Sequence, residues 1–249
     1  MTIDNMTTNP ICTIVGAGEG LGQSLAKTFA RNGFDIALVT RSLETTKTFA
    51  STLQTEFGDS RVACFSADVT HPSECEKTLT SIANDFGACE VLIYNVCDGF
   101  HRCAPLELEY DDLERTLKLE VIGALAAAKS VIPDMRKRGS GTVLFSSATA
   151  AYRGSASYPA YAIGKFGLRA LSQSLAKAYA ADGVHVAHIR LDCDLDVPIM
   201  QALYGDKYDP EVLADPDSVA ENYWWVYRQP KSAWSNEVEL RPNTEIWTY

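Results

Sequence analysis

Residues 11–22 read ICTIVGAGEGLG, and this stretch decides the fold. The run Ile11–Val15 is short and apolar, as expected of a strand buried in a parallel sheet. The glycines that follow let the backbone turn sharply and approach a pyrophosphate closely. The helix expected over Gly20–Asn32 offers the positive end of its dipole to the phosphates. A glycine-rich turn between a first strand and a helix therefore predicts a dinucleotide site.

From this turn to about residue 190, short apolar runs alternate with longer amphipathic segments. The pattern predicts strands at Ile11–Val15, Asp35–Val39, Arg61–Phe65, Val91–Tyr94, Thr142–Phe145 and Val184–Ile189. It predicts helices at Gly20–Asn32, Leu43–Phe57, Pro72–Phe86, Tyr110–Lys137 and Ala160–Ala181. Such alternation is typical of an α/β fold, here a Rossmann-type, doubly wound parallel sheet covered by helices on both faces.

We expect a single domain over residues 1–249, because this length suits one large α/β unit and no linker or internal repeat divides the chain. The alternation stops after residue 190. Residues from about 191 to 249 are predicted to form a substrate loop and a tail, with two proline-bounded segments. One of these segments is rich in aromatic residues, at Asn222–Tyr227.

Charge and cysteine content exclude several classes of function. The net charge of −10 disfavours nucleic acid and anionic membranes as partners. No stretch approaches the roughly 18 apolar residues of a membrane span. Seven scattered cysteines form no CxxC pair, so we expect neither a metal site nor a disulfide framework. Because the first residues are polar and lack a basic segment, we expect a cytoplasmic protein with reduced thiols.

In an open parallel sheet, ligands bind outside the carboxyl ends of the strands, so the residues directly after each strand are informative. The second strand is followed by Arg41, whose guanidinium can pair with the 2′-phosphate of NADP(H) or stack on adenine. An acidic residue at that point would favour NAD(H). Glu19, in the glycine-rich turn, disfavours a phosphate by like-charge repulsion. We expect NADP(H) in preference to NAD(H); the alternative for Arg41 is an exposed surface cation.

A tyrosine and a lysine one helical turn apart begin the last predicted helix. Tyr161 and Lys165 have the i, i+4 spacing that brings an ammonium beside a phenol, whereas Tyr152 and Tyr158 both have alanine at i+4. A free tyrosine has a pKa of about 10, and a nearby positive charge lowers that pKa. This spacing alone occurs by chance in many proteins. It makes Tyr161 and Lys165 a candidate acid–base pair, in which Lys165 would lower the pKa of Tyr161.

Together these motifs resemble the short-chain dehydrogenase/reductase family. The spacing of Gly16, Gly20 and Gly22 is similar to the family's TGxxxGxG turn, with Val15 in place of the threonine. Residues 141–176 closely resemble the region around the family's catalytic tyrosine. The last part of the chain, residues 222–242, resembles the ending of a little-characterised subgroup.

The resemblance implies roles for individual residues. Ser147, at the end of the fifth predicted strand, would donate a hydrogen bond to the substrate oxygen. It lies one residue further from Tyr161 than in the family pattern, which a longer loop explains, and it is preferred over Ser146. Lys165 would also bind the nicotinamide ribose. The residues implied in cofactor binding are Gly16, Gly20, Leu21, Gly22, Arg41, Asp68, Val69, Asn95, Tyr161 and Lys165.

The chain departs from the family pattern around the expected nicotinamide end. Glu120 stands where the family has an asparagine of its catalytic group, and we count it as a candidate catalytic residue. It could take over a proton relay, pair with Lys165 and blunt its effect on Tyr161, or turn elsewhere. The other departures are Tyr94 for asparagine, Cys97 for glycine, Asp192-Cys193 for Pro-Gly and Val197 for threonine.

The expected function is an NADPH-dependent reductase, or the reverse dehydrogenase, acting on a small organic carbonyl or alcohol. The changes at Glu120, Asp192 and Cys193 motivate an alternative, a cyclase, isomerase or lyase on the same scaffold; a catalytically silent nucleotide-binding protein is the third. The substrate walls are expected in residues 97–105, 148–158 and 194–228, and the resemblance implies a homodimer or homotetramer. Four aromatic residues line this pocket or make core or dimer contacts: Tyr204, Tyr208, Trp224 and Trp225.

Overall fold

A computed structural model describes residues 9–97 and 101–245 of the chain. Residues 98–100 of the expected substrate wall, and both ends of the expected domain (1–8 and 246–249), lie outside the described residues. Seven parallel strands form one sheet in the order β3-β2-β1-β4-β5-β6-β7. They are β1 (Ile11–Val15), β2 (Asp35–Thr40), β3 (Val62–Ser66), β4 (Cys89–Tyr94), β5 (Gly141–Ala148), β6 (Val184–Leu191) and β7 (Glu237–Leu240).

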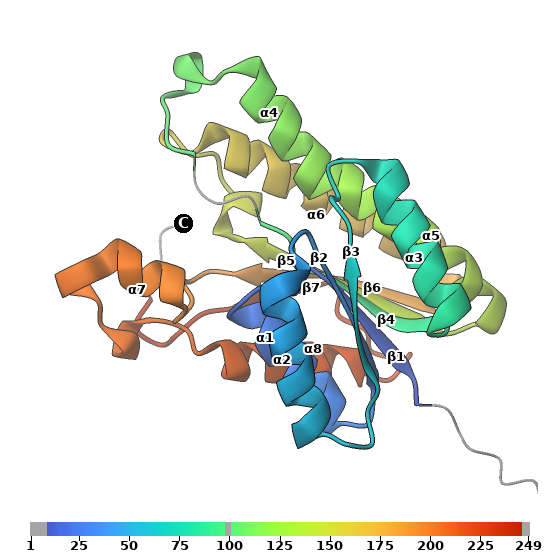
Figure 1. Ribbon diagram of the computed structural model, residues 1–249. Helices are drawn as coiled ribbons and strands as arrows, with labels where there is room; N and C mark the ends of the chain where they lie inside the picture. Colours follow the sequence, from blue (N-terminus) through green and yellow to red (C-terminus); the bar gives the residue numbers. More distant parts are fainter. Residues whose placement is uncertain (1–8, 98–100, 246–249) are drawn as a thin grey trace, which may run out of the picture.

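The predicted doubly wound parallel sheet is therefore confirmed, with helices on both faces (Figure 1). The α-helices are α1 (Leu21–Arg31), α2 (Leu43–Glu56), α3 (Pro72–Asp85), α4 (Tyr110–Leu117), α5 (Gly123–Arg138), α6 (Pro159–Tyr179), α7 (Pro198–Tyr204) and α8 (Pro216–Tyr227). A π-helical turn, η2 (Lys118–Ile122), joins α4 to α5. Short 3-10 turns occur at η1 (Pro105–Glu107), η3 (Thr149–Ala151), η4 (Ala180–Asp182), η5 (Gly205–Lys207) and η6 (Pro210–Val212).

Two hydrophobic clusters hold the layers together, one on each face of the sheet. Helices α3, α5 and α6 pack on one face, and α1, α2 and α8 on the other. Because side chains alternate along a strand, neighbouring residues of β5 belong to different layers. Val143 and Phe145 lie in the α6 layer, whereas Leu144 lies in the α8 layer. Ser146 and Ser147, near the end of β5, therefore face opposite layers.

The long helix predicted over Tyr110–Lys137 is interrupted. Its middle is the π-helical turn η2, which contains Glu120. A π-helical turn inserts an extra residue into the helix and is found mostly at functional sites. Amphipathic periodicity does not resolve one extra residue within 28, so the sequence predicts a continuous helix where the structure has α4, η2 and α5.

The tail contains a strand that the sequence analysis did not predict. β7 pairs in parallel with β6, from His188↔Glu237 to Leu191↔Leu240. Its sequence, EVEL, is short and half charged, so it lacks the apolar run by which the other strands were recognised. The expectation that the alternation ends at residue 190 is therefore wrong at this edge of the sheet.

His188 of β6 makes the folded state sensitive to acid. Its side chain is 1% exposed, and its Nε2 has no hydrogen-bond partner among the described residues. Burial is the largest of the effects that lower the pKa of His188 to about 4, and the nearby charges of Arg169, Lys165 and Arg190 act in the same direction. The Glu237 carboxylate raises this pKa but does not outweigh them. An unfolded histidine has a pKa of about 6.5, so below that pH the unfolded chain binds a proton that the folded chain does not.

We therefore expect the free energy of unfolding to fall as the pH drops from 6.5 toward 4. Between about pH 7 and about pH 5, His188 alone accounts for about 2 kcal/mol of this loss. Urea unfolding at both pH values should show that His188→Gln loses about 2 kcal/mol less than the wild type. His101→Gln, at a largely exposed histidine, is the control and should keep the wild-type dependence. An unchanged dependence in His188→Gln would contradict the prediction.

Candidate active site

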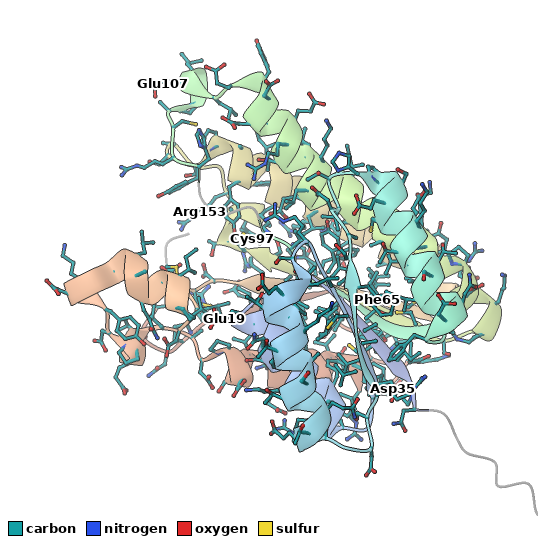
Figure 2. All side chains as sticks on the ribbon, in the orientation of Figure 1. Glu19, Asp35, Phe65, Cys97, Glu107 and Arg153 are labelled. Carbon is teal, nitrogen blue, oxygen red and sulfur yellow. The ribbon has the colours of Figure 1, made fainter. Side chains whose placement is uncertain are left out.

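The predicted site residues gather at the carboxyl edge of the sheet. The strand order reverses between β1 and β4, and in such folds ligands bind at this switch point. Figure 2 shows Glu19, Cys97 and Arg153 toward this end of the molecule, whereas Asp35, at the start of β2, lies at the other end. The topology thus brings together segments that are more than 100 residues apart in the sequence.

The glycine-rich turn is clamped against the end of β4. Asn95 Nδ2 donates a hydrogen bond to the Gly16 carbonyl at 3.1 Å, and the Asn95 amide donates to the Val15 carbonyl at 2.8 Å. Gly16 has φ +91°, and a Cβ there would lie 2.5 Å from the Asn95 carbonyl oxygen. A Cβ on Gly22 would lie 2.8 Å from the Gly16 carbonyl oxygen. Both positions therefore exclude any larger residue, as a backbone that closely approaches a ligand requires.

The start of α1 is suited to a phosphate. Gly20 has φ +92° and precedes the helix without a side-chain hydrogen bond to its free amides, and the first turn carries no acidic residue. The first amides of a helix lack intrahelical partners, so those of Leu21 and Gly22 are available to an anion. Val197 packs directly against Gly20 and closes the turn from the side of β6. The residues present thus fit a dinucleotide.

The residues expected on the adenine side also lie together. Arg41 is exposed just after β2, and the Ser66 hydroxyl donates to its carbonyl at 3.4 Å. Hydrogen bonds from Thr70 lower the pKa of Asp68, and the charges of His71 and Arg41 lower it further. The structure therefore keeps Asp68 ionised beside the Arg41 cation. Val69, which follows it, is buried.

Tyr161 and Lys165 lie in the first turns of α6, as the spacing predicts. The Lys165 Nζ lies 5.5 Å from the centre of the Tyr161 ring. The same Nζ donates to Glu120 Oε2 at 2.8 Å, and both side chains of this ion pair are buried. Of the three possibilities for Glu120, the structure shows the pair with Lys165. Gly164 lets α6 approach the π-helical turn, because a Cβ there would lie 3.1 Å from Glu120 Cγ.

This pairing changes the expected electrostatics of Tyr161. Burial raises the pKa of Tyr161; Lys165 lowers it, but Cys97 and Glu120 raise it again, and it ends above its usual value. Lys165 thus lowers the pKa of Tyr161, as the sequence predicts, but burial outweighs the effect of Lys165. Burial also opposes the charge on Lys165, but Glu120, Tyr161 and Cys97 together outweigh burial and raise the pKa of the ammonium. The tyrosine is thus protonated and the lysine charged at neutral pH.

The two serines at the end of β5 have different environments. Ser146 points toward α8, where the buried Tyr223 hydroxyl donates to its Oγ at 2.8 Å. Ser147 belongs to the α6 layer by strand alternation. Its Oγ is buried and has no hydrogen-bond partner among the described residues. A buried hydroxyl without a hydrogen-bond partner costs free energy unless a ligand supplies that partner. The geometry therefore favours Ser147 over Ser146 as the substrate-binding serine.

Cys97, in the position of the family's glycine, enters the site from the β4 side. Cys97 is exposed, and its side chain lies near enough to Tyr161 to raise the pKa of the phenol.

Asp192, which replaces the proline of the family pattern, is held by the tail. Its carboxylate pairs with Arg241 at 2.5 Å and accepts a hydrogen bond from the Thr149 hydroxyl. Sequence reasoning missed Arg241 and also Tyr223. Both lie in the stretch 222–242, where the resemblance to a subgroup ending assigns no individual contacts, and no spacing rule connects them to β5 or β6.

The two tryptophans and the two tyrosines named in the tail have different environments. Trp224 is a core contact, because its ring packs edge-on against Phe29 and Phe34 at 5.5 and 5.9 Å. Trp225, its neighbour, is 54% exposed. The two tyrosines bind carboxylates of the substrate loop: Tyr204 donates to Asp194 at 2.5 Å and Tyr208 to Asp196 at 2.6 Å.

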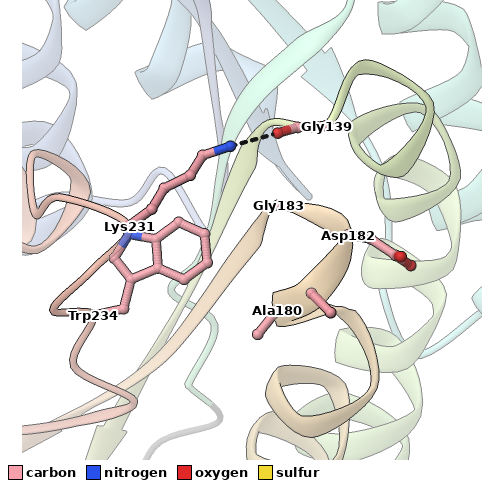
Figure 3. A pocket seen from close by; sticks show the side chains of 7 residues that line it. Gly139, Ala180, Asp182, Gly183, Lys231 and Trp234 are labelled. Atoms are coloured by element: carbon pink, nitrogen blue, oxygen red, sulfur yellow. Dashed lines mark hydrogen bonds between the residues drawn. The ribbon is translucent and has the colours of Figure 1, made fainter.

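A separate hollow lies at the opposite, amino edge of the sheet. Its volume is about 330 Å³, and Lys231 crosses it to donate to the Gly139 carbonyl at 2.8 Å (Figure 3). Its walls include Gly139, two residues before β5, and Gly183, directly before β6. Because ligands of this fold bind at the carboxyl edge, we assign this hollow no part in the active site.

Residues 9–97 and 101–245 contain no group of three or more histidine, cysteine, aspartate or glutamate side chains able to hold a metal ion. None of their helices combines the length and apolar character that a membrane crossing demands.

Comparison with known proteins adds to this geometry. The family model described as "short chain dehydrogenase" matches residues 10–193. Glycine betaine reductase ATRR of Emericella nidulans is 26% identical over 244 residues, which cover 94% of this chain but only 19% of that protein. The chain thus spans about a fifth of this relative.

Solved structures with the same fold were also found. A short-chain dehydrogenase from Rhodopseudomonas palustris is 29% identical, with a TM-score of 0.80, and the match covers 94% of this chain and 99% of that one. L-Sorbose reductase from Gluconobacter frateurii, solved with NADPH and L-sorbose, is 21% identical, with a TM-score of 0.84 over 96% of this chain and 98% of that one.

Proposed function

This chain belongs to the short-chain dehydrogenase family, and on that premise we propose that it is an NADPH-dependent reductase of a small organic carbonyl compound. The observation that carries the proposal is the buried, unpartnered hydroxyl of Ser147, on the face of the sheet covered by the helix of Tyr161 and Lys165. The carbonyl oxygen of a substrate would accept a hydrogen bond from the Ser147 hydroxyl and so give it a partner. That oxygen would lie on the same face of the sheet as the phenol of Tyr161.

The chemistry divides between cofactor and protein. When bound, NADPH supplies a hydride to the carbonyl carbon, which leaves negative charge on the oxygen. Ser147 donates a hydrogen bond to that oxygen and stabilises the charge. Tyr161 donates its phenolic proton to the same oxygen and so forms the alcohol. Lys165 stabilises the tyrosinate that remains until a proton returns from solvent.

Tyr161 holds the proton that carbonyl reduction consumes. Burial keeps the pKa of Tyr161 above its usual value, so the phenol is protonated before the reaction begins. Oxidation of an alcohol would use the tyrosinate instead, which the Glu120 carboxylate beside Lys165 disfavours.

Arg41 supports NADPH as the cofactor. It is exposed at the end of β2, close to Asp68, where a guanidinium can form charge-assisted hydrogen bonds with a 2′-phosphate. We expect Arg41→Gln to weaken NADPH binding about tenfold, corresponding to about 1.4 kcal/mol, and to leave NADH binding unchanged. The dissociation constants can be measured from nicotinamide fluorescence. Arg136→Gln, at an exposed arginine near the amino edge, is the control. Equal effects on both cofactors would contradict this role.

The proposed reaction is tested by turnover on a panel of carbonyl compounds. One of the named structures is an L-sorbose reductase, so the panel should contain this ketose together with simple aldehydes and ketones. At least one compound is expected to consume NADPH, seen as loss of its absorbance, and to yield the alcohol. A product of unchanged oxidation state, formed without loss of NADPH, would instead indicate a cyclase, isomerase or lyase. NADPH binding without any turnover would indicate a binding protein.

A further inference from the structure

The unpredicted strand β7 presents a row of charged side chains to one face of the sheet. Because alternate residues of a strand share a face, Glu237 and Glu239 point the same way, and Arg241, directly after β7, continues this row. Each one pairs with an opposite charge on another element. Glu237 binds Arg169 of α6 through two hydrogen bonds of 2.8 Å, Glu239 pairs with Arg190 of β6, and Arg241 pairs with Asp192. We call these three ion pairs the β7 ladder.

The β7 ladder becomes more buried toward the carboxyl edge. The Glu237–Arg169 pair is 35% and 24% exposed, whereas the Asp192–Arg241 pair is 7% and 12% exposed. Glu239 also contacts Arg241 and so joins the second pair to the third. A pair removed from water is screened less than a surface pair, and losing one partner costs more. The end of the ladder at the carboxyl edge, where Asp192 contacts Thr149, is thus its most strongly coupled part.

The partners of the β7 ladder hold the loop that follows Ser147. The Thr149 hydroxyl donates to Asp192, and Arg169 donates to the Ala151 carbonyl at 3.5 Å. The ring of Tyr152 is contacted by two of the guanidiniums: Arg169 lies 4.6 Å and Arg190 4.2 Å from its centre. Residues 149–152 therefore depend on all three pairs, although none of these residues contacts β7 through its backbone.

From these contacts we propose that β7 positions the active-site loop, and that Arg241 is a positioning residue acting through Asp192 and Thr149. The backbone of β7 already pairs with β6, including a hydrogen bond from the Asp192 amide to the Leu240 carbonyl at 2.8 Å. The side-chain pairs add a different constraint, because they end on the loop and fix the chain directly after Ser147. The inference rests on the proposed function only in that Ser147 is the group placed for the substrate.

The experiment compares Arg241→Gln with the wild type by hydrogen–deuterium exchange and by NADPH titration. Without the guanidinium, Asp192 is freed from the tail and the loop opens more often. We expect amides 149–153 to exchange about tenfold faster, while β1 keeps its protection and NADPH affinity changes less than about threefold. Arg241→Lys should restore part of the protection, because it keeps the charge. Arg136→Gln, whose pair with Asp182 lies at the amino edge, should leave the loop unchanged.

A second variant keeps the test decisive if Arg241→Gln does not fold. Thr149→Val removes the hydrogen bond to Asp192 with little change in shape, and it should also accelerate exchange in residues 149–153. Unchanged exchange in the loop would overturn the proposal, and so would equal acceleration in β1, which indicates a merely structural role. If the loop responds as expected but the wild type reduces no carbonyl compound, the proposed function fails and the positioning role stands.

Discussion

Tyr161→Phe is expected to lower turnover about a thousandfold while NADPH affinity stays within about threefold of the wild type. The substitution removes only the hydroxyl, so the ring keeps its place above the Lys165 ammonium, 5.5 Å away. Without the phenolic proton, the alkoxide formed after hydride transfer must take a proton from water. General acid catalysis by a positioned side chain contributes about 10²- to 10⁴-fold, which sets the size of the effect. Steady-state NADPH consumption and fluorescence titration measure the two quantities.

The control for this variant lies on the same helix. Tyr179→Phe removes a hydroxyl from the last residue of α6, where the ring packs against Arg136 far from the site. It should leave turnover unchanged. If Tyr161→Phe retains more than about a tenth of the wild-type rate, another group supplies the proton and the assignment of Tyr161 is wrong.

Glu120→Ala is expected to destabilise the protein by about 3–5 kcal/mol, because it leaves the buried Lys165 charge without its partner. The Lys165 side chain is 3% exposed, so water does not readily replace the lost carboxylate. Urea unfolding at neutral pH measures the loss. Glu114→Ala breaks the exposed pair with Lys118 two turns earlier and is expected to leave the unfolding midpoint nearly unchanged.

A double variant separates the charge from the packing. In Glu120→Leu with Lys165→Met, both charges are replaced by apolar groups of similar volume, which is often neutral or stabilising for a buried pair. We expect this protein to regain most of the stability lost in Glu120→Ala and to show no turnover. If the double variant is as unstable as Glu120→Ala, the loss comes from packing around the π-helical turn and not from an uncompensated charge.

Local sequence patterns were sufficient to predict most of the fold. The glycine-rich turn after β1 and the alternation up to β6 both reflect rules of short range, namely backbone freedom and the periodicity of burial. β7 obeys neither rule. Its four residues gain their stability from pairing with β6 and from ion pairs with distant arginines, which a single segment does not display.

The site was predictable to the extent that it follows from strand ends and helix spacing. Gly16, Asn95, Ser147, Tyr161 and Lys165 all lie where these rules place them. The partner of Lys165 was only one of three possibilities, because its position depends on how α6 packs against the π-helical turn. The raised pKa of Tyr161 was not predictable either, since it results from burial, which opposes the effect of the neighbouring lysine.

The place of β7 in the sheet has a consequence for its neighbour. β7 covers the edge of β6, whose eight residues are nearly all buried. An uncovered edge of this kind would offer unpaired backbone groups to other chains. The outer edge is instead formed by β7, and a short strand with two glutamates among its four residues is poorly suited to edge-to-edge pairing.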